Sequence, residues 1–174
     1  MQKRPPYENL TVYQLALVNQ ELTEQFTAKW IESMRRKSQM DEAARSVAQC
    51  IAEGHMQESL KGYIYLSGIA RGSNVELEKD YRNFLIAGRY SIWPIHDPKI
   101  REFRGFRACW ISQNTLNTPK LPSSPEEAAN MLLTFCNMEG YLIRRLVESL
   151  YVKHKTEGGL TEKLYRERTK FRGF

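Results

Sequence analysis

The chain has 174 residues, of which 41% are hydrophobic and 26% charged, which suffices for one domain with a real core and argues against a disulfide-dependent scaffold. Its formal net charge of +6 fits a polyanionic partner, either nucleic acid or an acidic protein, and fits a solvated basic surface equally well. No apolar run approaches the roughly 18 residues of a membrane helix, and no hydrophobic segment follows residues 1–6, so we expect no membrane insertion, no signal peptide and a cytoplasmic location.

Hydrophobic periodicity predicts two helices before the first glycine of the chain. Residues 10–30 carry apolar side chains at three-, four- and seven-residue steps. Residues 33–53 carry a second stripe that includes Met40, Val47 and Ile51, and Gly54 is predicted to close this helix.

The third predicted helix, over 58–89, has small and polar residues in the middle of one face. Ser67, Arg71 and Asn74 interrupt the stripe there, which predicts an internal polar cluster. Gly68 and Gly72 lie four residues apart. Because glycine inside a helix costs about 0.5–1 kcal/mol relative to alanine, we expect a neighbouring helix to approach closely at these two positions.

Cap signals predict the remaining elements. Asp97 followed by proline begins a short helix to about residue 113, and Ser124 followed by proline and two glutamates begins a long helix that stops at Gly158. Residues 114–124 are predicted to be a loop. Residues 158–174 form a basic tail, for which a helical start and disorder both remain open.

Four long amphipathic helices predict an all-α fold, an antiparallel up-down-up-down four-helix bundle over residues 1–157. The short helix lies in an insertion at about 92–124, between the third and fourth bundle helices.

Three motifs carry a family resemblance: Tyr7–Leu10 with the following Tyr13–Ala16, the segment 45–54, and the segment 65–73 with Glu76-Leu77. They resemble the four-helix-bundle family encoded in ribosomal-RNA intervening sequences, related to the accessory variability protein of diversity-generating retroelements. A proline near Ala48 and an asparagine near Cys50, common in the family, are absent here. The resemblance implies a non-enzymatic protein, a homo-oligomer that is most often a pentamer, and RNA, DNA or a reverse transcriptase as partner.

The charged residues of the second and third predicted helices have two interpretations. Arg71 with Glu53 and Glu76 could form a catalytic site, but a structural ion pair is favoured because no nucleophile accompanies them. The structural motif comprises Glu53, Gly54, Gly68, Arg71, Gly72, Ser73 and Glu76. We predict no catalytic residue, no metal site and no cofactor, since Glu-x-x-His pairs and phosphate-binding glycine loops are absent.

Two basic segments are the predicted nucleic-acid-binding residues. The first comprises Lys99, Arg101, Arg104 and Arg107, with Phe103, Phe106 and Trp110 interleaved. The aromatic rings could stack on bases, but docking on the bundle is favoured for them, with the arginines facing water. The second comprises Lys153, Lys155, Arg166, Arg168, Lys170 and Arg172, in a segment that could equally be a solvated tail.

Three functions follow as hypotheses. The first is a non-enzymatic oligomer that binds RNA or DNA, and the alternative is a protein–protein interaction scaffold. A hydrolase or nuclease is the least favoured.

Overall fold

The computed structural model describes residues 5–106 and 119–173, and this part of the chain is helical with no β-strand. A short 3-10 helix, η1, precedes the α-helices. The helices are η1 (Pro6–Asn9), α1 (Thr11–Trp30), α2 (Met34–His55), α3 (Leu60–Ala87), α4 (Pro98–Gly105), α6 (Pro125–Glu157) and α7 (Leu160–Arg172). The all-α prediction is therefore confirmed.

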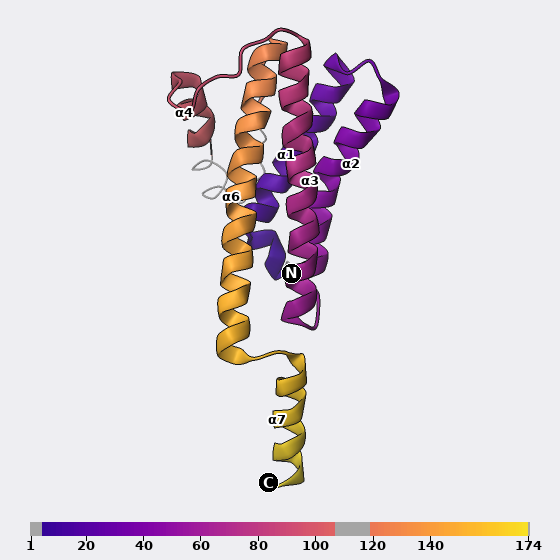
Figure 1. Ribbon diagram of the computed structural model, residues 1–174, viewed down its shortest axis with the longest axis vertical. Coiled ribbons are helices and arrows are strands. Elements are labelled where there is room, and N and C mark those ends of the chain that lie inside the picture. The colour runs from indigo at the N-terminus through magenta and orange to yellow at the C-terminus, as the bar shows by residue number, and fades with distance from the viewer. Residues whose placement is uncertain (1–4, 107–118, 174) are drawn as a thin grey trace, which may run out of the picture.

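The four long helices pack side by side, and we call them the helical body (Figure 1). Helix α1 packs on α2, α2 on α3, α3 on α6, and α6 on α1. Two groups of buried apolar side chains fill the space between them. The larger contains Phe26, Tyr81 and Phe135, and the smaller contains Val47, Ile51 and Ile143. None of the helices in the described ranges is both long and apolar enough to cross a membrane.

The predicted helix starts are confirmed by their caps. The side chains of Ser33 and Ser59 accept hydrogen bonds from backbone N–H groups in the first turns of α2 and α3. Asp97 Oδ1 accepts one from the Lys99 N–H at 2.9 Å, and Ser124 Oγ accepts one from the Glu127 N–H at 3.5 Å. Each satisfies a donor that the helix itself leaves without a partner.

Gly54 does not close α2 as predicted, because α2 continues to His55. The glycine is buried, and a Cβ at this position would lie 2.6 Å from a ring carbon of Tyr63 on α3. Gly54 therefore lets the ring of Tyr63 lie against the backbone of α2, and its role is close packing.

The predicted polar cluster lies in the centre of the helical body. Asn19 of α1, Ser67 and Asn74 of α3, and Glu139 of α6 are all buried. Asn74 Nδ2 donates to the Cys136 carbonyl of α6 at 3.0 Å, and a Cβ on Gly140 would lie 2.9 Å from the same nitrogen. Gly140 is thus a glycine that close approach between helices requires.

The expected close approach at Gly68 and Gly72 is wrong within the chain. Both are exposed, and a Cβ on either would meet no described atom within 4 Å. The inward face of α3 runs through Ser67, Ala70 and Asn74, and Arg71 is turned by about 100° from Ala70, its buried neighbour. Arg71 is exposed and forms no ion pair with a described residue.

Two side chains of α6, Asn130 and Glu126, hold the connection between α3 and α4. Glu126 Oε1 accepts hydrogen bonds from the Ser91 N–H at 3.3 Å and from the Trp93 Nε1–H at 3.1 Å. Asn130 Oδ1 accepts a hydrogen bond from the Trp93 N–H at 2.9 Å, and Asn130 Nδ2 donates to the Ser91 carbonyl at 2.9 Å. Helix α4 then packs on α6. Because α4 and this connection cover the outer side of α6, every residue from Ala128 to Cys136 is buried.

Candidate nucleic-acid interface

Helix α4 separates its apolar side chains from its basic ones. Ile100 and Phe103 are buried, whereas Lys99, Arg101 and Arg104 are exposed. The sequence favoured docking of this short helix on the bundle through its apolar side chains. Burial confirms this for these two residues. The arginines of α4 remain available to a ligand.

Lys99 is less available than its neighbours on α4. Its Nζ forms an ion pair with Glu127 Oε1 at 2.9 Å and lies 5.4 Å from the ring centroid of Trp93. Arg101 and Arg104 form no ion pair with a described residue. Arg107 and Trp110 lie outside the described residues.

The tail is a helix joined to α6 through a fastened turn. Gly158 has a φ of 80°, which favours glycine, and allows the chain to change direction. Glu162 Oε2 accepts a hydrogen bond from the Gly159 N–H at 2.7 Å, and Arg166 Nη2 donates to the Glu157 carbonyl at 2.6 Å. Backbone hydrogen bonds, first to its own N–H and then to Gly159, lower the pKa of Glu162.

A basic hollow of about 560 Å³ lies between this turn and the α2–α3 connection. Lys153, Arg166 and Lys170 line it together with Lys163, whereas Lys155, Arg168 and Arg172 do not. The acidic side chains at the same hollow are Glu58, Glu157 and Glu167. The structure therefore gathers half of the six predicted tail residues around one concave surface, where acidic groups also stand.

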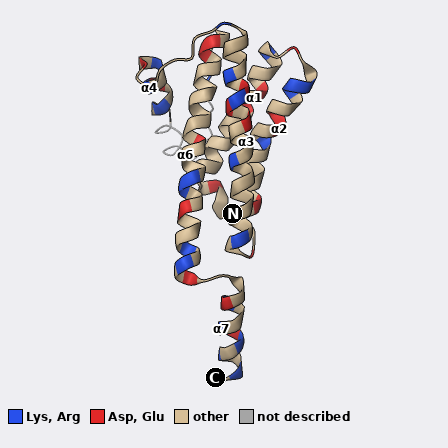
Figure 2. Ribbon diagram, in the orientation of Figure 1, with Lys and Arg blue, Asp and Glu red and all other residues tan. Residues whose placement is uncertain are grey.

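Two further basic residues extend the surface along α6. Arg144 and Arg145 have 58% and 65% of their side chains exposed, and both share the carboxylate of Glu148. Sequence reasoning missed them because they follow the core stripe of the last long helix. In the sequence, the sign of this exposed surface was the pair of adjacent arginines directly after Ile143. Figure 2 shows that Lys and Arg recur along this half of α6 and along α7.

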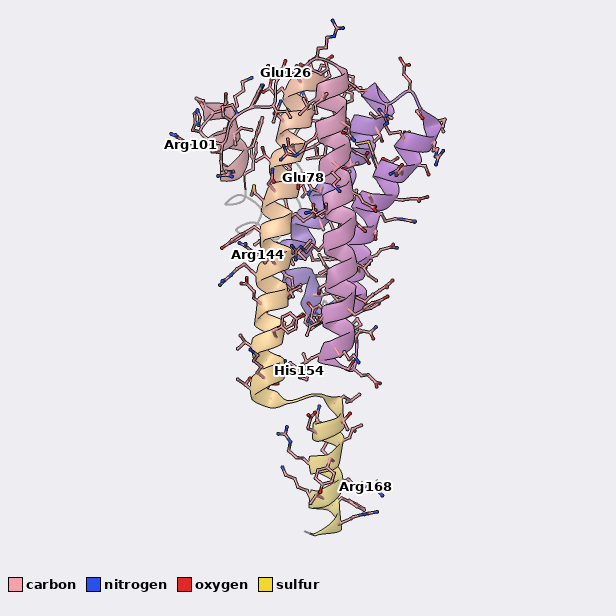
Figure 3. All side chains as sticks on the ribbon, in the orientation of Figure 1. Glu78, Arg101, Glu126, Arg144, His154 and Arg168 are labelled. Atoms are coloured by element: carbon pink, nitrogen blue, oxygen red, sulfur yellow. The ribbon has the colours of Figure 1, made fainter. Side chains whose placement is uncertain are left out.

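The two predicted basic segments lie far apart. Helix α4 packs near the start of α6, and α7 follows its end. At about 1.5 Å per residue, the 33 residues of α6 separate them by roughly 50 Å. Figure 3 shows Arg101 on α4 and Arg168 on α7 toward opposite ends of the long axis, with Arg144 between them.

The motif residues of α2 and α3 do not form the predicted ion pair. Glu53 and Glu76 are exposed, like Arg71. Ser73 is the member that links the two helices, since its Oγ lies 2.9 Å from Ser46 Oγ. The spacing of the motif residues in the sequence is compatible with one face of α3. At Arg71, however, that face is turned away from α2.

The buried carboxyl group of Glu139 is the most perturbed acid of the described chain. Burial raises its pKa to about 8, and the nearby Asn19 side chain offsets the rise only in part. Both carboxyl oxygens lack a hydrogen bond of good geometry. The Glu139 side chain is 0% exposed, which places it among the core residues of the helical body. Across residues 5–106 and 119–173, no three His, Cys, Asp or Glu side chains are arranged to hold a metal ion.

Comparison with known proteins adds one match. The family model described as 23S rRNA-intervening sequence protein matches residues 8–88, which contain α1, α2 and α3. No curated protein and no solved structure matches the chain. The relation to retroelement accessory proteins therefore stays a prediction, and α4, α6 and α7 lie outside the match. Residues 8–88, fewer than half of the 174 in the chain, are thus similar to the 23S rRNA-intervening sequence protein family.

Proposed function

We propose that this chain is a non-enzymatic, homo-oligomeric protein that binds RNA or DNA through basic surfaces. The observation that carries the proposal is a set of exposed cationic side chains that form no ion pair with any described residue: Arg101, Arg104, Lys155, Arg168, Lys170 and Arg172. Phosphates of a polynucleotide would neutralise them and release bound counterions, which favours binding at low salt. The family name, which refers to 23S rRNA, supports an RNA partner.

We further propose that the helical body is an antiparallel up-down-up-down bundle. Its support is the closed order of packing, in which each long helix contacts two others. The connections 31–33 and 56–59 are short, and a short connection favours an antiparallel arrangement of the two helices that it joins.

The outer face of α3 supports self-association. Tyr65, Ile69 and Val75 are 69%, 39% and 38% exposed, and Gly68 and Gly72 lie on the same face. No described atom lies close to either glycine, so the described part of the chain does not explain why α3 tolerates them. A second copy packed on this face would bury the apolar side chains, and by resemblance the assembly would be a pentamer.

Assembly would multiply weak phosphate contacts. One copy offers only a few unpaired cations at each end of α6, and such contacts are weak at physiological salt. Several copies held in one frame act at high effective concentration. The proposal therefore needs both the oligomer and the basic side chains.

Replacing Arg101, Arg104 and Arg107 together with glutamine tests the proposal. We expect an unchanged oligomer mass by light scattering, weaker polynucleotide binding, and a salt slope reduced by about 2–3. The matched control replaces Arg45, Lys61 and Lys79, three exposed cations of α2 and α3, and should change the slope little. A monomeric wild type would refute the multiplication of contacts, and an unchanged slope would move binding away from α4.

The alternative function is a protein–protein interaction scaffold, with a reverse transcriptase as the partner that the resemblance implies. The exposed apolar face of α3 favours it. A mainly apolar protein interface would show little salt dependence, whereas phosphate contacts make log affinity fall linearly with log salt. The same salt series thus separates the two functions.

A further inference from the structure

The α1–α2 turn, the end of α3 and the start of α6 lie at the same end of the helical body (Figure 1). Residues of these three segments line a second hollow, distinct from the basic surfaces. Its volume is about 460 Å³. Three aromatic side chains line it, Trp30, Phe84 and Tyr90, and all three are half-buried. Each of the three side chains therefore leaves part of its ring surface open to a planar ligand.

The rings are held in place by the core and by each other. The ring centroid of Phe26 lies 5.1 Å from that of Trp30 and 4.9 Å from that of Phe84. Tyr90 stacks on Phe84 with 5.9 Å between centroids and 26° between planes. Any side chain at Gly88 would collide with the Tyr90 ring, so this glycine allows Tyr90 to fold back over the end of α3.

Positive charge accompanies the rings. Arg36 lines the hollow from the first turn of α2, and Lys29 Nζ lies 4.8 Å from the ring centroid of Trp30. Glu32 is the acidic side chain at the hollow. Arg36 forms no ion pair with a described residue, although its charge lowers the pKa of Asp80, which burial raises overall.

The chain tolerates two unfavourable features at this place. The first turn of α2 contains Arg35, Arg36 and Lys37 and no acid, so three like charges stand at the positive end of a helix dipole. Arg89, between two residues that line the hollow, has a φ of 55°, where glycine is usual. Each feature costs stability, and the first places Arg36 at the hollow.

We propose that this hollow binds an unpaired nucleobase of single-stranded nucleic acid, stacked on the Trp30, Phe84 and Tyr90 side chains, with an adjoining phosphate at Arg36. The inference rests on the proposed nucleic-acid function and adds the strand type to it. Aromatic rings with neighbouring cations suit this ligand, because every base has a face to stack and a phosphate beside it. A base inside a duplex is already stacked and paired, so a duplex cannot use the hollow.

The test compares a labelled 12-nucleotide oligoadenylate RNA with the same RNA in a duplex. Variants Trp30→Leu and Tyr90→Leu keep an apolar side chain and remove the stacking face. Base–aromatic stacking contributes about 1–3 kcal/mol per base, so single-strand affinity should fall about 5- to 150-fold, while duplex affinity stays within twofold. Trp30→Phe and Tyr90→Phe should restore single-strand binding, which separates stacking from damage to the fold.

Matched controls use neighbouring positions. Arg36→Gln should lower the salt slope for the single strand by about one, whereas Arg35→Gln, at a residue that does not line the hollow, should not. Tyr151→Leu removes another half-exposed ring, 51% accessible on α6, and should leave the single-strand preference intact.

The outcomes separate the two levels of the proposal. Wild-type binding with no loss in either leucine variant, or with equal losses for single strand and duplex, overturns the hollow alone and leaves the proposed function standing. Such a result would fit a hollow that takes an aromatic side chain of a protein partner. No wild-type binding to either RNA overturns this inference, and a further lack of binding to long RNA and DNA overturns the proposed function with it.

Discussion

Replacing Glu139 with glutamine should stabilise the protein in a pH-dependent way. The side chain is 0% exposed, and burial raises the pKa of its carboxyl from 4.5 to about 8. The folded protein therefore holds a proton that the unfolded chain releases above pH 4.5. Glutamine has nearly the same shape and stays uncharged at every pH.

The sign follows from proton linkage. Between pH 4.5 and 8 the folded state binds more protons at Glu139 than the unfolded state does, so stability falls as pH rises. At about 1.36 kcal/mol per pH unit, the shift from 4.5 to about 8 corresponds to a loss of about 5 kcal/mol. At pH 7 the loss is about 3 kcal/mol, and above pH 8 it no longer grows.

Urea unfolding of both proteins from pH 4.5 to pH 9 measures the difference. The advantage of Glu139→Gln should be smallest at pH 4.5, grow with pH and level off above pH 8. Every other titratable group is common to both proteins, so its contribution to the difference cancels. Glu148→Gln, at an exposed position of the same helix, should give a flat difference within about 0.5 kcal/mol. Parallel stability curves for wild type and Glu139→Gln would refute a buried, protonated carboxyl.

Four further substitutions, with one control, test the packing. Gly140→Leu should lower the free energy of unfolding by about 1–3 kcal/mol or more, because its Cβ would lie 2.9 Å from Asn74 Nδ2. Gly72→Leu should instead leave the fold intact and lower the oligomer mass measured by light scattering. The reverse pattern would contradict both assignments. Arg71→Ala should shift the free energy of unfolding by less than about 0.5 kcal/mol, since the side chain is exposed, and a large loss in urea melts would reveal a partner. Thr23→Val should cost about 1–3 kcal/mol by removing the 2.8 Å hydrogen bond to the buried Tyr81 hydroxyl, and Thr11→Val, at a less buried position of the same helix, is its control.

The long helices could be predicted because their signals are local. Proline at the first helical position and Ser or Asp caps mark the starts of α4 and α6, and apolar periodicity marks the interiors. The observed ends differ from the predictions by at most two residues for α1, α2 and α3. The polar centre of α3 was also visible, because Ser67 and Asn74 interrupt an apolar stripe.

The site was less predictable because it depends on rotation and on distant contacts. Arg71 and Ala70 are adjacent in sequence, and about 100° of helix rotation decides which one is buried. The role of Gly140 depends on Asn74, which is 66 positions away. The aromatic hollow joins residues from the α1–α2 turn, the end of α3 and the start of α6, and no spacing in the sequence connects these three segments.

The hydrogen-bonded turn at Gly158 fixes the rotation of α7 about its axis relative to α6. Hydrogen bonds from Gly159 to Glu162 and from Arg166 to Glu157 tie the start of α7 to the end of α6. One residue added to the exposed end of α6 would turn everything beyond it by about 100° and advance it by about 1.5 Å. The number of residues in α6 therefore sets the direction in which the tail cations point. A polyanion meets these cations at a place that depends on the length of α6 as well as on the charge of the tail.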